Sequence, residues 1–316
     1  MNSINNLIDT DSMCSSNLLN VPQLDKVWLK HRSNADQVSQ YYIGTEFQDY
    51  AFRINECSQL LNFHIVDLGT DQISTQFKLN TARFCRVRYC PVCQWRRSLM
   101  WKAKAYSVLP RIVADYPTSR WLFITLTVRN CLITELRVTL DWMHQSFKRL
   151  TKLKDFPAFG WLKSTEVTRS KDNSAHPHFH CLLMVKSSYF GKNYLKQSDW
   201  LELWRHSLRT NYSPVLHVQA LKKDKCPSEI IPELLKYCTK ESDLIIDKDW
   251  FLELTRQMQK ARTISTGGVV KEYLKHLMIE RENLISDDND TSRFEDKEHL
   301  YFKWNRISKK YNLFSE

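Results

Sequence analysis

Two histidines that stand two residues apart constrain this chain more than any other feature of its sequence. They lie in the segment His176–His180 (HPHFH), and the apolar run Cys181–Val185 follows directly. This pattern predicts a strand, and successive side chains of a strand point to opposite faces. His178 and His180 are therefore expected on one face, and Phe179 on the other. A single histidine is usually an ordinary core or surface residue, but two adjacent imidazoles provide two thirds of a metal site.

A carboxylate on the preceding strand can complete this site. The strand predicted over 161–168 carries Glu166, and a short loop joins it to the histidine strand. Neighbouring antiparallel strands place their side chains about 5 Å apart, and a further strand over 121–128 brings Thr125 to the same face. A hard divalent ion, Mg²⁺ or Mn²⁺, prefers a carboxylate beside the imidazoles. Glu166, His178 and His180 thus form a candidate ligand set with open positions for substrate oxygens.

The order of the predicted elements indicates an α+β fold with an antiparallel sheet. A last strand is expected over 215–220, and apolar stripes predict helices over 94–113 (ending near Pro110), 136–153 and 198–210. Pro232 is expected to open another helix, and helical pattern with a break at Gly267–Gly268 follows from Asp247. The expected divisions are a polar, flexible lead-in over 1–45, a cysteine-rich segment with a basic helix over 46–113, the domain with the candidate site over 114–245, and a C-terminal helical region over 246–316.

Four cysteines form a second candidate metal site. Cys85, Cys90 and Cys93 have the spacing C-x4-C-x2-C, and 27 residues separate them from Cys57. The chain has 9 cysteines, an odd number, which favours metal over disulfides. Four thiolates suit a structural zinc ion in a zinc-ribbon-like segment, with reduced structural cysteines as the alternative. Guanidinium groups near this segment could contact phosphates, and they belong to Arg86, Arg88, Arg96 and Arg97.

Composition narrows the function classes. The formal net charge of +11 suits a polyanionic partner such as a nucleic acid, although a merely basic protein would have the same charge. The 6 glycines form no phosphate-binding loop, which argues against nucleotide-hydrolysing motors and dinucleotide enzymes. No run approaches 18 apolar residues, and the first 20 residues lack the apolar core of a signal peptide. We therefore expect a cytoplasmic protein without a membrane partner.

A tyrosine with a nearby carboxylate is a candidate nucleophile. Glu233 and Tyr237 are four residues apart, so they share one face of the predicted helix. A tyrosine can form a covalent intermediate with a phosphoryl group. Lys236 and Lys240 flank it and could hold a phosphodiester backbone. An ordinary helix surface with an i,i+4 contact is the alternative reading of the pair.

Taken together, these motifs resemble the rolling-circle plasmid replication initiators (Rep proteins) of the single-tyrosine HUH endonuclease class. The resemblance spans roughly residues 50–270, and its motifs occur in the expected order. They are Phe84–Arg97, Phe123–Thr127, Glu166–Thr168, His176–His180 and Glu233-x-x-x-Tyr237-x-x-Lys240. The resemblance implies an HUH domain whose central antiparallel sheet, a ferredoxin- or RRM-like palm, is flanked by helices and preceded by the zinc-ribbon-like segment.

The resemblance also implies a reaction. Tyr237 would attack a scissile phosphate at the plasmid origin, keep the 5′-phosphate as a phosphotyrosine and leave a 3′-hydroxyl that primes a DNA polymerase. Glu233 matches the glutamate that activates water to end the cycle, and a host helicase is an expected partner in the bacterial cytoplasm. A second tyrosine in the next helical turn, which marks the two-tyrosine branch, is absent. His176 is an extra histidine that either contacts DNA or caps the loop.

Two other functions compete with this interpretation. An HUH transposase would share the nick but differ in biology, whereas a relaxase usually has its tyrosine before the histidines, unlike this chain. A zinc-ribbon DNA-binding regulator without catalysis would use the cysteines and arginines. It would leave the candidate metal set and Tyr237 unexplained.

Overall fold

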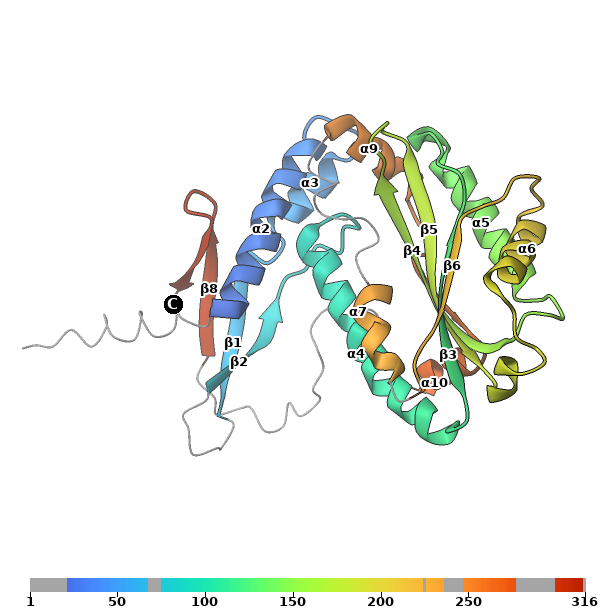
Figure 1. Ribbon diagram of the computed structural model, residues 1–316. Helices are drawn as coiled ribbons and strands as arrows, with labels where there is room; N and C mark the ends of the chain where they lie inside the picture. Colours follow the sequence, from blue (N-terminus) through green and yellow to red (C-terminus); the bar gives the residue numbers. More distant parts are fainter. Residues whose placement is uncertain (1–21, 68–74, 224–225, 236–246, 277–298, 315–316) are drawn as a thin grey trace, which may run out of the picture. The chain divides into compact units, whose positions relative to one another are not determined.

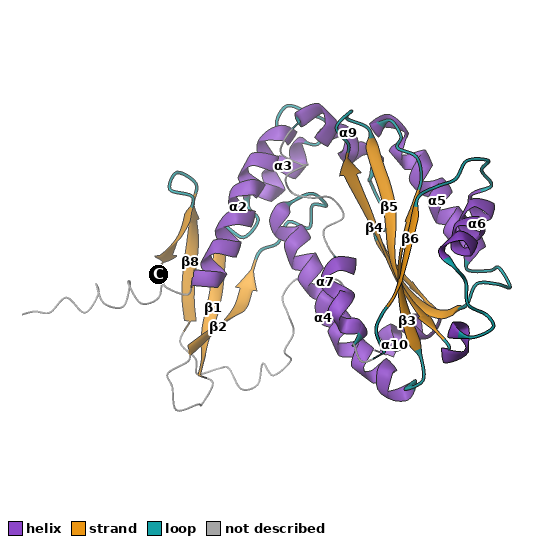
Figure 2. Cartoon of the chain, in the orientation of Figure 1, coloured by secondary structure: helices purple, strands orange, loops and turns teal. Residues whose placement is uncertain are grey.

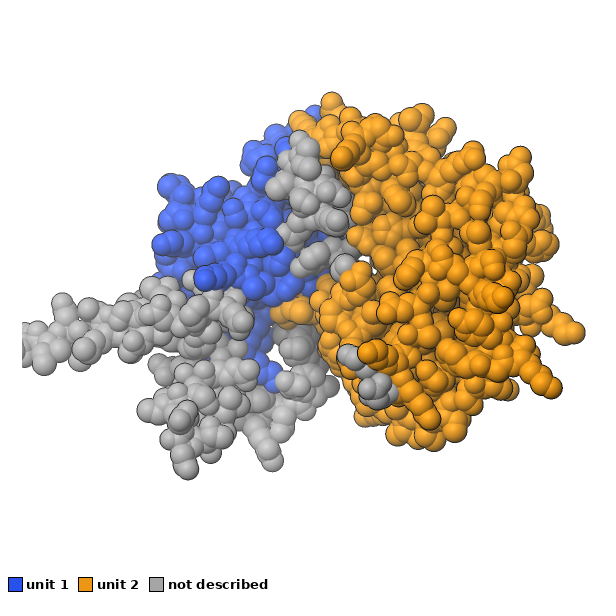
Figure 3. Space-filling view, in the orientation of Figure 1, with its two compact units in different colours: residues 1–95, 284–316 blue, residues 96–283 orange. Residues whose placement is uncertain are grey.

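The computed structural model describes residues 22–67, 75–223, 226–235, 247–276 and 299–314. The chain divides into two compact units, coloured in Figure 3. Unit 1 combines residues 1–95 with 284–316, and unit 2 comprises residues 96–283. Among the described helices, none combines the length and the apolar character that a membrane span requires.

Unit 1 is built on a four-stranded antiparallel sheet with the order β2-β1-β8-β9. Its strands are β1 (Leu60–Asp67), β2 (Thr75–Ala82), β8 (His299–Asn305) and β9 (Lys310–Phe314). Its helices are α2 (Pro22–Tyr42) and α3 (Gln48–Asn55), which pack against each other. Trp28 of α2 packs edge-on against the rings of Phe63, Trp95 and Tyr311. Strands from the two ends of the chain therefore share one sheet and one aromatic core.

Helix α2 shows that the predicted flexible lead-in is wrong for residues 22–42. The helix buries Ala35, Val38 and Tyr42 on one face, with no exposed surface on any of them. Arg32 lies on the same face and is also fully buried. Its guanidinium pairs with Asp36 at 2.7 Å and donates to the backbone oxygen of Ile54. Buried polar residues such as Arg32 and Ser39 gave this segment its misleading loop-like composition.

Unit 2 contains a five-stranded, fully antiparallel sheet with the order β6-β3-β5-β4-β7. Its strands are β3 (Arg120–Thr127), β4 (Ala158–Arg169), β5 (Ala175–Val185), β6 (Leu216–Ala220) and β7 (Ile264–Gly267). The histidine strand β5 is central, with β3 and β4 on its two sides. The α+β class with antiparallel sheets is confirmed.

Helices cover both faces of this sheet, as Figures 1 and 2 show. One face is covered by α4 (Pro91–Asp115), α7 (Ile231–Leu234) and α10 (Gly268–His276). The opposite face is covered by α5 (Leu136–Leu150), with α6 (Gln197–Leu208) beside it. The remaining elements are α9 (Lys248–Gln257) and the short 3-10 helices η1 (Ile133–Glu135), η2 (Ser187–Phe190) and η3 (Pro227–Ile230). The face under α4 and α7 is the one that carries the histidines.

The structure differs from three local predictions or refines them, in unit 2 and in the C-terminal region. Helix α4 does not end near Pro110 but continues to Asp115, because the neighbouring Leu109 and Ile112 are buried in the core. Helices α9 and α10 confirm the helical pattern after Asp247, whereas β8 and β9 are strands, so that prediction is wrong for 299–314. The predicted break at Gly267–Gly268 is the junction of β7 and α10. Gly268 has a φ of +55°, and a Cβ there would collide with the carbonyl oxygen of Phe159.

Candidate active site

Strand register brings the predicted ligands together on one face of the unit 2 sheet. Glu166 of β4 stands opposite His178 of β5, and Thr125 of β3 stands opposite His180. Phe179 points to the other face and is fully buried. The predicted orientation of this strand is therefore confirmed.

One carboxylate oxygen of Glu166 meets both imidazoles. Its Oε2 atom lies 3.1 Å from Nε2 of His178 and 3.0 Å from Nε2 of His180. The two imidazole rings are perpendicular, with centroids 4.8 Å apart. The three residues form a cluster that can hold a metal ion, since their ligand atoms lie within 4.8 Å of one another.

The outer ring nitrogens orient the two histidines. Nδ1 of His178 lies 3.3 Å from the carbonyl oxygen of His176, which can only accept a hydrogen bond, so this nitrogen is the donor. Nε2 of a neutral His178 ring then presents a lone pair toward a carboxylate, an unfavourable contact unless a proton or a cation lies between them. Nδ1 of His180 contacts the hydroxyl of Thr125 at 3.2 Å. Such outer contacts fix the tautomer of metal-binding histidines.

The separation of these atoms fits a divalent ion. Ligands bound at about 2.1 Å in octahedral geometry are about 3.0 Å apart along each edge. The observed nitrogen-to-oxygen distances are 3.0 and 3.1 Å. Each of the three side chains keeps between 9% and 12% of its surface exposed, so a substrate oxygen can reach the remaining positions.

The carboxylate of Glu166 is held in its ionised form. Burial alone would raise its pKa, but the hydrogen-bond contacts with His178 and His180, and the positive charges of these rings when they are protonated, lower the pKa well below the usual range. An ionised carboxylate is a suitable ligand for a hard cation.

Two serines attach the end of helix α7 to the sheet and to α4. Ser164 Oγ donates to the carbonyl oxygen of Leu234 at 2.5 Å, and Ser98 Oγ donates to that of Leu235 at 2.9 Å. Ser164 is paired with His180 across the β4–β5 ladder. The last carbonyls of a helix lack partners within the helix, so these hydroxyls fix the C-terminal end of α7 beside the candidate metal site.

Helix α7 carries one predicted catalytic residue and precedes the others. Glu233 lies in α7 and is half-buried. The predicted nucleophile Tyr237 and the two basic residues Lys236 and Lys240 lie outside the described residues. His176 lies on the same sheet face as the ligand histidines but is not part of the three-residue cluster; its ring packs edge-on against His178 at 5.4 Å.

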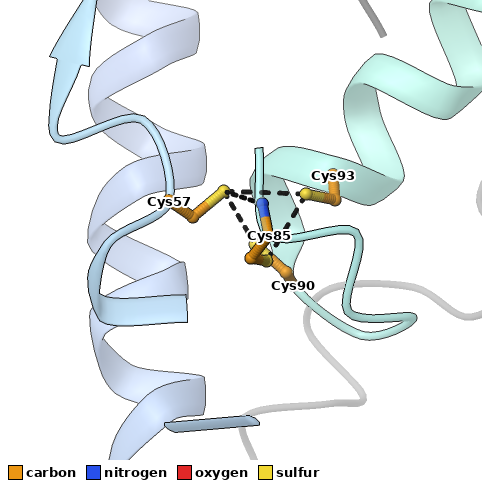
Figure 4. Close-up of side chains that lie close together, drawn as sticks. All are labelled: Cys57, Cys85, Cys90 and Cys93. Carbon is orange, nitrogen blue, oxygen red and sulfur yellow. Dashed lines mark hydrogen bonds between the residues drawn. The ribbon is translucent and has the colours of Figure 1, made fainter. Parts of the chain in front are cut away.

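The four predicted cysteines also meet, and Figure 4 shows their sulfur atoms turned toward a common centre. The distances from Cys93 Sγ are 3.6 Å to Cys57 Sγ and 3.5 Å to Cys85 Sγ, and Cys90 Sγ lies 3.7 Å from Cys57 Sγ. These distances exclude disulfides. Four sulfurs around a metal at about 2.3 Å in tetrahedral geometry would be about 3.8 Å apart, so the cluster can hold such an ion.

Burial and mutual contact shift the pKa values of the cysteine thiols in opposite directions. Burial raises the pKa of Cys90, whereas hydrogen bonds from the other three thiols lower that of Cys93. Backbone amides support the sulfurs, with the amide of Arg86 donating to Cys93 Sγ at 3.2 Å and that of Cys85 to Cys57 Sγ at 3.4 Å. A bound cation would allow all four sulfurs to ionise together.

The predicted DNA-contacting arginines differ in environment. Arg86 is exposed, and Arg88, Arg96 and Arg97 are half-buried. Burial lowers the pKa of Arg96 to about 10. Sequence reasoning missed the two serines that anchor α7. Single hydroxyl residues within a strand or a helix give no local signal when their partners are distant backbone carbonyls.

Comparison with known proteins places these sites within one family. The sequence profile described as Replication protein matches residues 76–312. The "Protein rep" of Lactiplantibacillus plantarum is 32% identical over 299 residues, which cover 88% of this chain and 92% of that protein. The "Protein rep" of Streptococcus pneumoniae serotype 2 (strain D39 / NCTC 7466) is 34% identical over 75% of this chain and 77% of its own length. A "Replication protein" of Staphylococcus aureus is 34% identical over 66% of this chain and 96% of its own length. No solved structure matches the chain.

Proposed function

Because this chain belongs to the Replication protein family of plasmid replication initiators, we propose that it starts rolling-circle replication by nicking one strand of its plasmid origin. The proposal assigns unit 2 to the single-tyrosine HUH endonuclease class. The observation that carries it is the convergence of Glu166, His178 and His180 at about 3 Å on one face of the sheet, where each side chain keeps about a tenth of its surface exposed. A DNA-binding regulator would have no use for such a set.

Glu166, His178 and His180 would hold Mg²⁺ or Mn²⁺. The bound ion would polarise the non-bridging oxygens of the scissile phosphate as a Lewis acid. Thr125 and the backbone of His176 would keep the two imidazoles in the ligand orientation. Both would act on the ring nitrogens that do not face Glu166.

Tyr237 is the proposed nucleophile. Its phenolic oxygen would form a bond to phosphorus after losing its proton, and the bond from phosphorus to the 3′ oxygen would break. The 5′-phosphate would remain on the tyrosine, and the departing oxygen would take up a proton to give the 3′-hydroxyl primer.

The anchoring of α7 supports this role. The described segment that contains α7 stops at Leu235, whose carbonyl is held by Ser98, and Leu234 is held by Ser164 beside His180. Tyr237 follows Leu235 by two residues, a span of about 7 Å at most. The attachment therefore limits how far the nucleophile can lie from the metal set.

Glu233 is the proposed base for the closing step. A carboxylate on α7, four residues before the tyrosine, could take a proton from the water or hydroxyl that attacks the second phosphodiester.

The remaining assignments concern binding. We assign a structural zinc ion to Cys57, Cys85, Cys90 and Cys93 because four thiolates in tetrahedral spacing suit zinc. Origin DNA, single-stranded or as a hairpin, would be contacted by the basic residues Arg86, Arg88, Arg96, Arg97, Lys236 and Lys240. A host helicase and a DNA polymerase would act on the nicked origin in the bacterial cytoplasm.

The decisive experiment is to incubate the full chain with a labelled origin oligonucleotide and Mn²⁺. Label that stays on the protein under denaturing conditions would reveal the covalent adduct. The Tyr237→Phe variant should bind the oligonucleotide with near-normal affinity but form no adduct, because only the phenolic oxygen is removed. Tyr212→Phe is the matched control: the Tyr212 hydroxyl accepts a hydrogen bond from the backbone amide of Arg129 at 3.3 Å. An adduct that persists in Tyr237→Phe would place the nucleophile elsewhere.

A further inference from the structure

A buried lysine lies on the back of the strand that carries Glu166. Lys163 of β4 points to the opposite face of the sheet, and only 2% of its surface is exposed. Its Nζ atom lies 3.6 Å from the centroid of the Phe179 ring and 3.1 Å from Nδ1 of His144. In the described part of the chain, no carboxylate lies within ion-pair distance of this ammonium. Burying a cation without a counter-charge is costly, so an anion bound nearby would offset part of this cost.

The lysine determines the state of its histidine neighbour. Nζ of Lys163 donates to Nδ1 of His144, so the hydrogen of the neutral ring is on Nε2. Burial and the nearby positive charges of Lys163 and Arg137 lower the pKa of His144 to about 4, which keeps the ring neutral at neutral pH. His144 therefore accepts a hydrogen bond from the buried ammonium at Nδ1 and offers an N–H donor at Nε2.

His144 lines a cavity of about 370 Å³ between α5 and the segment that joins α9 to β7. Arg137, Lys260 and Arg262 also line it, together with the hydroxyl residue Ser265, and the single lining carboxylate is Asp141. Asp141 pairs with Arg137 Nε at 3.4 Å. Lys260 and Arg262 are exposed and have no ion-pair partner in the described residues. The lining therefore has an excess of two positive charges, with Lys163 behind it.

Arg137 is held rigidly in this wall. Its Nη1 atom donates to the backbone oxygens of Gln257 at 3.4 Å and Gln259 at 2.8 Å. Because the neighbouring backbone already binds part of the guanidinium, little side-chain entropy remains to be lost when the rest of it binds a ligand.

We propose that this cavity is a binding site for a phosphate group, held by Arg137, Lys260, Arg262 and the Nε2–H of His144. A tetrahedral anion with two negative charges matches the charge excess, and guanidinium groups bind phosphate oxygens in pairs. The phosphate belongs either to a DNA backbone or to a free phosphate or phosphate monoester. The site lies on the sheet face opposite the candidate metal set, and it requires neither Tyr237 nor a metal ion.

The test is calorimetric titration of the full chain with inorganic phosphate, against chloride at equal ionic strength. The double variant Lys260→Gln/Arg262→Gln should bind phosphate at least about tenfold more weakly, since it cannot form two of the charge-assisted hydrogen bonds. Lys192→Gln, which removes an exposed charge away from the cavity, is the control and should bind like the parent chain. Equal phosphate binding by the double variant and the parent, or no phosphate binding above that of chloride, would overturn the proposal.

A second variant tests the buried charge without touching the cavity surface. Lys163→Met keeps most of the length of the side chain and removes its charge. We expect weaker phosphate binding by this variant, with an unchanged circular dichroism spectrum as evidence of folding. A folded Lys163→Met protein with parental phosphate affinity would contradict the role of the buried charge.

Single-stranded oligonucleotide binding separates the two sources of the phosphate. If the site binds a DNA backbone, the double variant should lower the slope of log affinity against log salt by about 0.7 for each backbone phosphate that it no longer neutralises. An unchanged slope together with weakened binding of inorganic phosphate would assign the site to a free phosphate or phosphate monoester.

Discussion

The cysteine cluster of unit 1 and the Glu166–His178–His180 set of unit 2 contrast in ligand chemistry and in access. Three of the four cysteines have no exposed surface, and the fourth, Cys85, is 9% exposed. The second set has three ligands of mixed oxygen and nitrogen type, and each keeps about a tenth of its side chain exposed. A closed tetrahedral sulfur site holds a fold together, whereas a three-ligand site with open positions leaves room for a substrate.

The supporting elements differ in the same way. The cysteines come from loops and from the start of α4, so the chain around them depends on the ligands for its shape. The histidines and Glu166 lie on paired strands of a five-stranded sheet, and the strands would hold their positions without an ion. The contrast therefore predicts that metal loss unfolds one unit and only inactivates the other.

The largest effect is expected in unit 1. Cys90→Ser should lose the bound metal and unfold this unit, because structural zinc binding contributes on the order of 10 kcal/mol to folding. Elemental analysis and limited proteolysis would measure both losses. Cys226→Ser is the control, since Cys226 is free and exposed. A parent protein that contains no zinc yet resists proteolysis would show that the four cysteines only pack in the core and bind no metal.

The corresponding change in unit 2 should spare the fold. His180→Ala should lower the nicking rate by at least about 10³-fold, since Lewis-acid stabilisation is worth several kcal/mol. The thermal unfolding of unit 2 should change far less than that of unit 1 does in Cys90→Ser. His206→Ala, on the exposed side of α6, provides the control. Global unfolding by His180→Ala would remove the distinction between the two sites.

A third substitution tests whether the buried ammonium of Lys163 lowers the stability of the fold. Burial lowers the pKa of Lys163 to about 8, below the value of about 10.4 for a free lysine. Between these pH values Lys163 binds more protons in the unfolded chain than in the folded protein, so its contribution to the free energy of unfolding rises with pH. Below this window the buried ammonium lowers the free energy of unfolding by a constant amount. Lys163→Met should raise the free energy of unfolding at pH 7 by about 1–3 kcal/mol. Chemical denaturation at pH 7 and pH 10 would measure this gain, which should shrink at the higher pH; a gain that is the same at both pH values would contradict the assignment.

The smallest effect is expected for the hydrogen bond that attaches α7 to the sheet beside the Glu166–His178–His180 set. Ser164→Ala removes the hydroxyl that holds the Leu234 carbonyl and should cost about 1 kcal/mol of stability. The nicking rate should fall about tenfold through misplacement of the following segment, with an unchanged KM for the oligonucleotide. Ser164→Thr keeps the hydroxyl and should restore the rate. A rise in KM without a change in kcat would mean that Ser164 affects DNA binding instead.

Much of unit 2 could be predicted because its signals are local. Alternation along 176–185 indicated the facing of His178, His180 and Phe179, and a short loop after Glu166 required an antiparallel neighbour. The strand ladder then determined which residues are opposite one another. Pattern alone was sufficient for the candidate metal set.

Unit 1 could not be predicted in the same way because its determinants are distant in the sequence. Arg32 is buried in α2, where the carbonyls of α3 and the carboxylate of Asp36 accept hydrogen bonds from its two terminal nitrogens. Strands β8 and β9 are short and partly charged, and β8 is stabilised by pairing with β1 more than 230 residues earlier. The buried Lys163 is similar, since its partner His144 belongs to a different element. Hydrogen bonds between residues that are distant in the chain produce no periodic pattern in the sequence.

The pairing of β1 with β8 has a consequence for how the protein emerges from the ribosome. Residues 96–283 are synthesised between the two parts of unit 1, so all strands of the unit 2 sheet are available before β8 exists. Until His299–Asn305 leaves the exit tunnel, β1 has one unpaired edge, and the aromatic core around Trp28 lacks Tyr311. A nascent chain therefore completes the half with the candidate nicking site first. Premature termination would release a chain with that site intact and an incomplete, strand-exposing first unit.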